Sequence, residues 1–145
     1  MTIRFTIPGV PVAQPRQRHR VIQSGGRAFA TNYTPSTHPV AAFKALTRLA
    51  ASQVYSGSPL DCPLVMLVVF VFQRPASVRK RDGTGRLPHT GRPDAENCLK
   101  AVQDALEGAV YRNDSLIYDV RAIKWKAAAD EQPHTEVEIV TQGEL

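Results

Sequence analysis

Hydrophobic spacing along the chain predicts a set of β-strands. Apolar and polar residues alternate near the N-terminus, and a continuous apolar run in the middle of the chain is typical of a buried central strand. Two further strands are expected in the last third of the chain. The predicted strands cover residues 2–8, 63–72, 116–126 and 136–141, with a hairpin of 19–23 and 28–31 around a Ser-Gly-Gly turn.

Two segments have the 3.6-residue spacing of amphipathic helices. The first is predicted over residues 37–54, with Pro39 in its first turn and an apolar stripe made of Val40, Phe43, Leu46, Leu49, Ala50 and Val54. The second is predicted over residues 94–107, with Asp94 as N-cap and Gly108 as its stop. The element order favours an α+β fold, in which two main helices pack on a mixed sheet.

Length and composition favour one domain over residues 1–145. The chain has 145 residues and 43% hydrophobic content, which suits a single core. The N-terminus lacks the pattern of a signal peptide, and the longest apolar run is too short to span a bilayer. We therefore expect a cytoplasmic protein without a membrane partner.

Charge is distributed unevenly along the chain. Residues 1–60 contain no acidic residue, the loop predicted over 74–93 is basic, and the segment 94–119 carries several acids. The basic half and the basic loop could contact the phosphates of a nucleic acid, although a solvated basic surface without a partner also explains the net charge of +5. The candidate residues for such phosphate contacts are Arg16, Arg18, Arg20, Arg79, Lys80 and Arg81.

Three carboxylates mark the acidic segment as the candidate chemical site. Asp94 and Glu96 lie at the predicted helix start, and Asp114 lies just before the next strand, so the three could converge. Oxygen ligands of this kind suit Mg²⁺. Each residue also has a structural explanation: Asp94 as a helix cap, Glu96 as a partner of the helix dipole, and Asp114 as a turn residue.

Several sequence motifs resemble those of the RusA family of Holliday junction resolvases. The strings PDAENCLKAVQDAL and YRNDSLI carry the most specific part of this resemblance. IPGVPVAQPRQR, YTP, VFVFQRP and IKWK are similar to other family segments in the same order. The likeness extends over nearly the whole domain, and it implies a bacterial or phage-encoded protein.

The resemblance implies a homodimeric, Mg²⁺-dependent endonuclease that makes paired symmetric nicks in branched DNA during recombination or repair. It implies that Asp94, Glu96 and Asp114 bind the metal, with Mn²⁺ as a substitute, and that Lys100 joins them in catalysis. Asn97, Asp104 and Asn113 match supporting positions of the motif. In the family the second acid is usually Asp rather than Glu96, and Asp commonly stands at the position of Asn113.

Two alternative functions remain open at this stage. The Glu96 and Asn113 departures could leave a junction-binding protein with weak or no cleavage, or the enzyme could act on flaps and other branched structures. Lys100 could neutralise charge in the transition state or hold Glu96 and Asp104 in place. His89 could transfer protons, contact a phosphate or be an ordinary surface residue.

Overall fold

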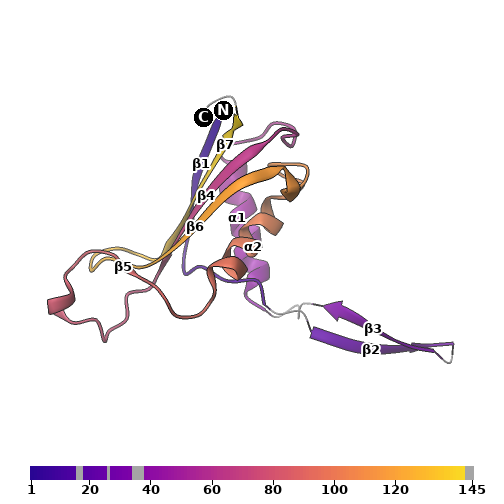
Figure 1. Ribbon diagram of the computed structural model, residues 1–145, viewed down its shortest axis with the longest axis horizontal. Helices are drawn as coiled ribbons and strands as arrows, with labels where there is room; N and C mark the ends of the chain where they lie inside the picture. The colour runs from indigo at the N-terminus through magenta and orange to yellow at the C-terminus, as the bar shows by residue number, and fades with distance from the viewer. Residues whose placement is uncertain (16–17, 26, 34–37, 143–145) are drawn as a thin grey trace.

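The computed structural model describes residues 1–15, 18–25, 27–33 and 38–142 (Figure 1). For the hairpin over residues 18–33 and for Lys80, the description covers the backbone and not the side chains. The regular elements, in chain order, are β1 (Thr2–Pro8), β2 (Arg18–Ser24), β3 (Arg27–Tyr33), α1 (Val40–Ser52), β4 (Leu64–Phe72), the 3₁₀ turn η1 (Lys80–Asp82), β5 (Leu87–Pro88), α2 (Ala95–Leu106), the 3₁₀ turn η2 (Asp114–Leu116), β6 (Ile117–Lys126) and β7 (His134–Thr141).

The main sheet is mixed, which confirms the α+β class predicted from the sequence. Its strand order is β1-β7-β4-β6-β5, and β2 and β3 form a separate two-stranded sheet. β4 pairs in parallel with β6 and antiparallel with β7. A parallel pair requires a crossover connection, and α2 supplies it between the end of β4 and the start of β6. The β2–β3 hairpin projects beyond the sheet and the helices (Figure 1).

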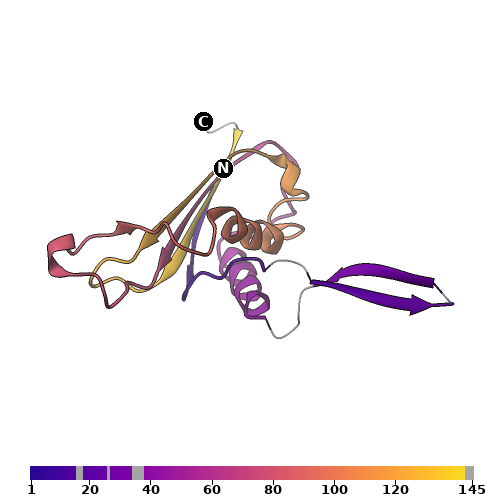
Figure 2. The same ribbon diagram turned by 60° about the horizontal axis from the view of Figure 1, so that its bottom comes forward.

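The hydrophobic core lies between the sheet and the two helices, which cover the same face of it (Figure 2). Alternate residues of the strands supply the sheet side of the core, as the period of two in their burial shows. The fully buried side chains include Leu64, Met66, Val68 and Phe70 of β4. β4 therefore is the buried central strand that the apolar run predicted.

The apolar stripe predicted for the first helix is partly wrong. Val40 and Phe43 are buried in α1, but Leu46 and Leu49 are 42% and 56% exposed. Thr47 is buried in their place, because its hydroxyl satisfies its hydrogen-bonding need by donating to the Phe43 carbonyl at 2.8 Å. The core face of α1 is thus rotated relative to the expected one.

The basic segment 74–93 contains more order than the predicted loop. It holds η1 and the short strand β5. The guanidinium of Arg74 donates to the carbonyls of Gly83, Gly85 and Ala127 at 2.6, 3.0 and 3.2 Å. This basic residue is therefore used to fold the segment, and is less available to an external anion.

Arg86 links the same segment to the strand β7 and to the connection before it. Its guanidinium donates to Glu131 at 2.6 Å and to Glu136 at 2.9 Å. The hydrogen bond from Arg86 holds the pKa of the Glu131 carboxyl at about 2, below its ordinary value.

We expect this interaction to make the stability of the protein sensitive to acid. Because the pKa of Glu131 is lowered in the folded chain, its stabilising contribution is present above the ordinary glutamate pKa and is lost as the pH falls toward 2. The melting temperature of Glu131→Gln should fall by a few degrees less than that of the wild type between pH 6 and pH 3. If the melting temperatures of the two proteins fell equally between pH 6 and pH 3, this role of Glu131 would be contradicted.

None of the helices in the described ranges is both long enough and apolar enough to cross a membrane.

Candidate active site

The first group of candidate residues lies where α2 begins. Asp94 is the N-cap residue of α2, but its carboxylate makes no capping hydrogen bond to the backbone. It accepts instead from the side-chain amide of Asn97 at 3.2 Å. Asp94 and Glu96 are both exposed. The capping explanation for Asp94 therefore does not account for its carboxylate, which remains accessible to a ligand.

A cleft opens beside this end of α2. Its volume is about 580 Å³, and its polar lining comes from three segments of the chain, with the side chains of Gln14, His38, Arg92, Asp94 and Asn97. The backbone N–H of Gln14 donates to the backbone carbonyl of Asn97 at 2.9 Å, which fixes the N-terminal segment against α2. The ammonium of Lys124 on β6 donates to the carbonyls of Gly91 and Pro93 at 2.6 Å each. These bonds hold the segment before Asp94 at the end of β6.

A second acidic group lies at the other end of α2. Carboxylate oxygens of Asp104, Glu107 and Asp114 lie within 4.8 Å of one another, close enough to hold one cation. Tyr111 is fully buried and donates its hydroxyl to the Gln103 carbonyl at 2.8 Å, which ties the connection after α2 to the helix. Burial raises the pKa of Tyr111, and the three carboxylates add to the effect.

Asp104 is predicted from the sequence as a supporting residue, whereas Glu107 is not. A signal for both residues was present, because acids are unfavourable at the C-terminal end of a helix, where the helix dipole is negative. Two acids in the last turn and beyond it indicate a role other than helix stability. A bound cation would provide one.

The predicted metal ligands do not meet within one chain. Asp114 joins Asp104 and Glu107, whereas Asp94 and Glu96 lie at the opposite end of α2. The 12 residues of this helix span about 18 Å at the standard rise of 1.5 Å per residue. The assignment of Asp94, Glu96 and Asp114 to a single site stays a prediction. It requires an arrangement in which groups at opposite ends of α2 bind the same ion.

Lys100 and Asn113 are placed as follows. Lys100 is exposed on α2 between the two acidic groups. Among the described residues it forms no ion pair with Glu96 or Asp104, and Asp104 faces the ammonium of Lys44 at 3.9 Å. No ion pair therefore supports the alternative in which Lys100 holds Glu96 and Asp104 in place. Asn113 caps η2, since its side chain accepts from the Ser115 amide at 2.9 Å.

The candidate DNA-binding residues fall into two sets. Arg79 and Arg81 are exposed at the tip of the basic segment, where the backbone of η1 also carries Lys80. Arg18 and Arg20 lie on β2, and their side chains are outside the described part of the chain, as is all of Arg16. With Arg74 and Arg86 engaged internally, Arg79 and Arg81 are cations of this segment that remain available to phosphates.

His89 and Cys98 are packed residues near the α2 start. The ring of His89 packs edge-on against Phe72 with a centroid separation of 4.7 Å. Burial lowers the pKa of His89, and the cations Lys124 and Lys126 lower it further, which favours a neutral ring. Burial raises the pKa of the Cys98 thiol to about 11, so this thiol remains protonated and is a poor metal ligand.

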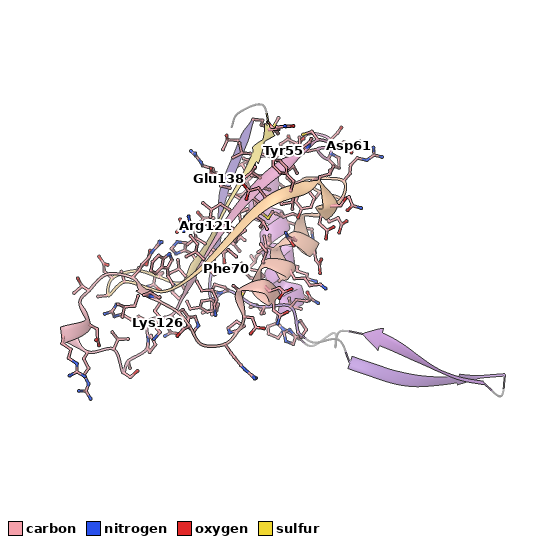
Figure 3. All side chains as sticks on the ribbon, viewed as in Figure 1. Tyr55, Asp61, Phe70, Arg121, Lys126 and Glu138 are labelled. Atoms are coloured by element: carbon pink, nitrogen blue, oxygen red, sulfur yellow. The ribbon has the colours of Figure 1, made fainter. Side chains whose placement is uncertain are left out.

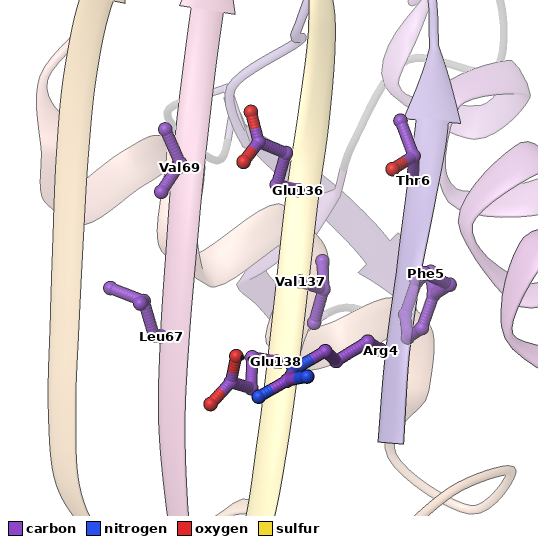
Figure 4. Close-up of a pocket in the computed structure, with 8 residues that line it drawn as sticks. All are labelled: Arg4, Phe5, Thr6, Leu67, Val69, Glu136, Val137 and Glu138. Atoms are coloured by element: carbon purple, nitrogen blue, oxygen red, sulfur yellow. Dashed lines mark hydrogen bonds and ion pairs between the residues drawn. The ribbon is translucent and has the colours of Figure 1, made fainter. Parts of the chain in front are cut away.

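A separate hollow on the helix-free face of the sheet lacks this chemistry (Figure 4). It has a volume of about 290 Å³, and an apolar floor of Leu67 and Val69. The ion pair between Arg4 and Glu138, at 2.8 Å, lies at its rim. Glu138 lies on the face of the sheet opposite the helices, away from the acidic groups of α2, so we place the candidate chemistry at the helix.

Comparison with known proteins identifies the family. The family described as endodeoxyribonuclease RusA matches residues 8–140. The chain therefore belongs to the RusA endodeoxyribonuclease family, as its motifs predicted. It is also similar to the uncharacterized protein YqaN of Bacillus subtilis (strain 168), with 32% identity over 143 residues that cover 94% of each protein.

Proposed function

We propose that this chain is a metal-dependent endonuclease that resolves four-way DNA junctions by paired nicks. The observation that carries this proposal is the pair of acidic groups at the two ends of α2, in a basic chain of the RusA family. The carboxylates of Asp94, Glu96 and Asp114 are exposed and form no ion pair among the described residues, which suits them to hold a divalent ion. Roles in recombination, repair and phage DNA processing follow from the same proposal.

The carboxylates fit Mg²⁺, with Mn²⁺ as a substitute. Both ions prefer oxygen ligands, and magnesium typically takes one or two carboxylates and completes its shell with water and phosphate oxygens. Asp94, Glu96 and Asp114 are the proposed ligands. An ion held by these residues would supply polarisation of the scissile phosphate and would lower the pKa of the attacking water.

Two copies of the chain are needed to complete this site. A magnesium ion lies about 2.1 Å from its ligand atoms, whereas α2 separates Asp94 from Asp114 by most of its length. All three residues can therefore bind the same ion only if Asp94 and Glu96 come from one copy and Asp114 comes from another. A symmetric homodimer would then contain two such sites, one for each of the paired nicks.

The remaining polar residues would bind and orient the DNA. Lys100 is exposed between the two acidic groups and could neutralise charge that develops on the phosphate. Asn97 holds the Asp94 carboxylate in one orientation through its side-chain amide. Arg79 and Arg81 would contact backbone phosphates without reading the base sequence, so junction binding should weaken steeply with salt.

Cleavage of labelled DNA structures tests the proposal. A mobile four-way junction, a flap and a linear duplex would be incubated with the protein in Mg²⁺, in Mn²⁺ and in EDTA. We expect symmetric paired nicks in the junction that require the metal. Binding without nicking in either metal would make the chain a junction-binding protein, and faster cleavage of the flap would make it a flap nuclease.

A further inference from the structure

The segment that leads from β5 into α2 is fastened to one residue of β6. The backbone N–H of His89 donates to the backbone carbonyl of Lys124 at 3.1 Å. The ammonium of Lys124 in turn donates to the carbonyls of Gly91 and Pro93 at 2.6 Å each. Lys124 therefore holds alternate residues of the chain that runs into Asp94.

Lys124 lies on the face of the sheet that the helices cover. Its cross-strand partner on β4 is Phe70, which is fully buried in the core and is labelled in Figure 3. Lys124 itself is half-buried, and it forms no ion pair with an acid among the described residues. Drawing an ammonium away from water without an acid beside it costs free energy. Its two bonds to carbonyls offset part of this cost, and they direct the charge at the start of α2.

Lys124 and Asp94 approach the same buried group from two elements. That group is the thiol of Cys98, near the start of α2. Burial raises the pKa of this thiol to about 11, while the charge of Lys124 lowers the pKa and that of Asp94 raises it. Lys124 therefore lies on the sheet side of the helix start, behind the residue whose carboxylate is exposed to solvent.

We propose that Lys124 is a positioning residue for the metal ligand Asp94, because its ammonium fixes the backbone that carries this carboxylate. The inference rests on the proposed function and extends the site to β6. The carboxylate of Asp94 makes no capping hydrogen bond to the helix backbone and accepts from the side chain of Asn97. The place of the carboxylate therefore depends on how firmly the backbone of residues 91–93 is held.

A small displacement of Asp94 is enough to slow cleavage. Magnesium demands near-ideal octahedral geometry, with ligand distances of about 2.0–2.1 Å. A misplacement of about 1 Å in an active site can reduce the rate by about 100-fold. Lys124 acts through the chain that carries Asp94, whereas Lys100 is exposed and is the lysine proposed to face the phosphate.

Amide hydrogen exchange without metal or DNA tests the support of this segment. Lys124→Met removes the charge and the donors and keeps most of the apolar length of the side chain. We expect the amides of residues 89–98 to exchange about tenfold faster in this variant, because the carbonyls of Gly91 and Pro93 lose their partner and the segment opens more often. Exchange at the wild-type rate would overturn the proposal.

Lys126→Met is the matched control. Lys126 lies two residues farther along β6, on the same face of the sheet, and is labelled in Figure 3. It also carries positive charge near the segment, but the bonds to Gly91 and Pro93 come from Lys124. Exchange in residues 89–98 should stay near the wild-type rate in this control. Equal acceleration in both variants would attribute the effect to lost charge and refute the role of the two bonds.

Single-turnover cleavage adds a readout that a purely structural role would not move. At saturating Mg²⁺ we expect Lys124→Met to cleave the junction about tenfold more slowly, while its dissociation constant for the junction stays near that of the wild type. In an Asp94→Asn background the same substitution should slow cleavage by less than about twofold, since the ligand that Lys124 positions is already lost. A tenfold loss in both backgrounds would contradict an action through Asp94.

Lys124→Gln is the second variant, for use if Lys124→Met does not fold. Its side chain is one bond shorter and uncharged, so it cannot reach both carbonyls as the lysine does. Faster exchange and slower cleavage are expected here as well. Wild-type behaviour in both measurements would count against the proposal in the same way.

The inference and the proposed function fail in different ways. If the wild type nicks no junction but Lys124→Met exchanges faster than Lys126→Met, the support of Asp94 stands and the proposed function is lost. If the wild type nicks junctions and Lys124→Met exchanges and cleaves as the wild type does, the inference alone is lost.

Discussion

Asp94→Asn is expected to reduce junction cleavage by about 100-fold or more while the junction still binds. The substitution removes a negative metal ligand and keeps the size and polarity of the side chain. Because Asp94 is exposed and its carboxylate makes no capping bond, the free energy of unfolding should change by less than about 0.5 kcal/mol. Gel-shift binding, thermal melts and single-turnover cleavage would be measured on the same preparation.

Glu138→Gln is the matched control for Asp94→Asn. It also replaces a carboxylate by an amide, but it lies on the helix-free face, where Glu138 pairs with Arg4. Its cleavage rate should stay near that of the wild type. If both variants lost activity equally, overall charge would explain the effect better than a metal site at Asp94.

Asp114→Asn is expected to cause a comparable loss, and Glu107→Gln a smaller one of about tenfold or less. Both carboxylates belong to the acidic group at the α2 end. Asp114 is the proposed ligand, whereas Glu107 acts as an additional charge near it. Cleavage rates across a Mg²⁺ titration would separate the two, since Glu107→Gln should recover at high metal concentration.

The opposite order of effects would point to a different site. If Glu107→Gln and Asp104→Asn abolished cleavage while Asp94→Asn did not, the metal would lie within one chain at the α2 end. Lys44→Ala provides a useful comparison, because it removes the cation that faces Asp104 at 3.9 Å without removing an acid.

The main elements of the fold could be predicted from the sequence, because burial imposes different periods on strands and helices. The alternation at Ile3, Phe5 and Ile7 and the apolar run of β4 follow directly from which face of each strand is covered. The parallel pairing of β4 with β6 required only a crossover helix between them. The short strand β5 escaped prediction because two residues give no period.

The face of α1 was harder to predict because hydrophobicity alone determined the expected stripe. Thr47 is fully buried, since its hydroxyl bonds within the helix, while Leu49 remains exposed. Polar residues that satisfy their own hydrogen bonds can occupy core positions, and a hydrophobic pattern cannot identify them.

The sequence predicts candidate residues for the acidic site but not their geometry, and their assignment as metal ligands stays a prediction. Sequence motifs selected Asp94, Glu96 and Asp114, and the family match supports the motif that contains them. Their separation depends on the straight course of α2, which places the helix start and the following turn at opposite ends. The sequence does not state whether two distant groups act in one chain or across two.

Subunit mixing tests the shared metal site most directly. Asp94→Asn and Asp114→Asn chains would be co-expressed with different affinity tags, and the mixed dimer purified through both tags. In a shared site both substitutions fall in one of the two sites, so the other keeps Asp94 from one copy and Asp114 from its partner. The mixed dimer should recover about half of the wild-type nicking rate and make single rather than paired nicks. A mixed dimer of Asp94→Asn with Glu96→Gln should stay inactive, because both ligands come from the same copy. A mixed Asp94→Asn and Asp114→Asn dimer as inactive as its parents would contradict the shared site.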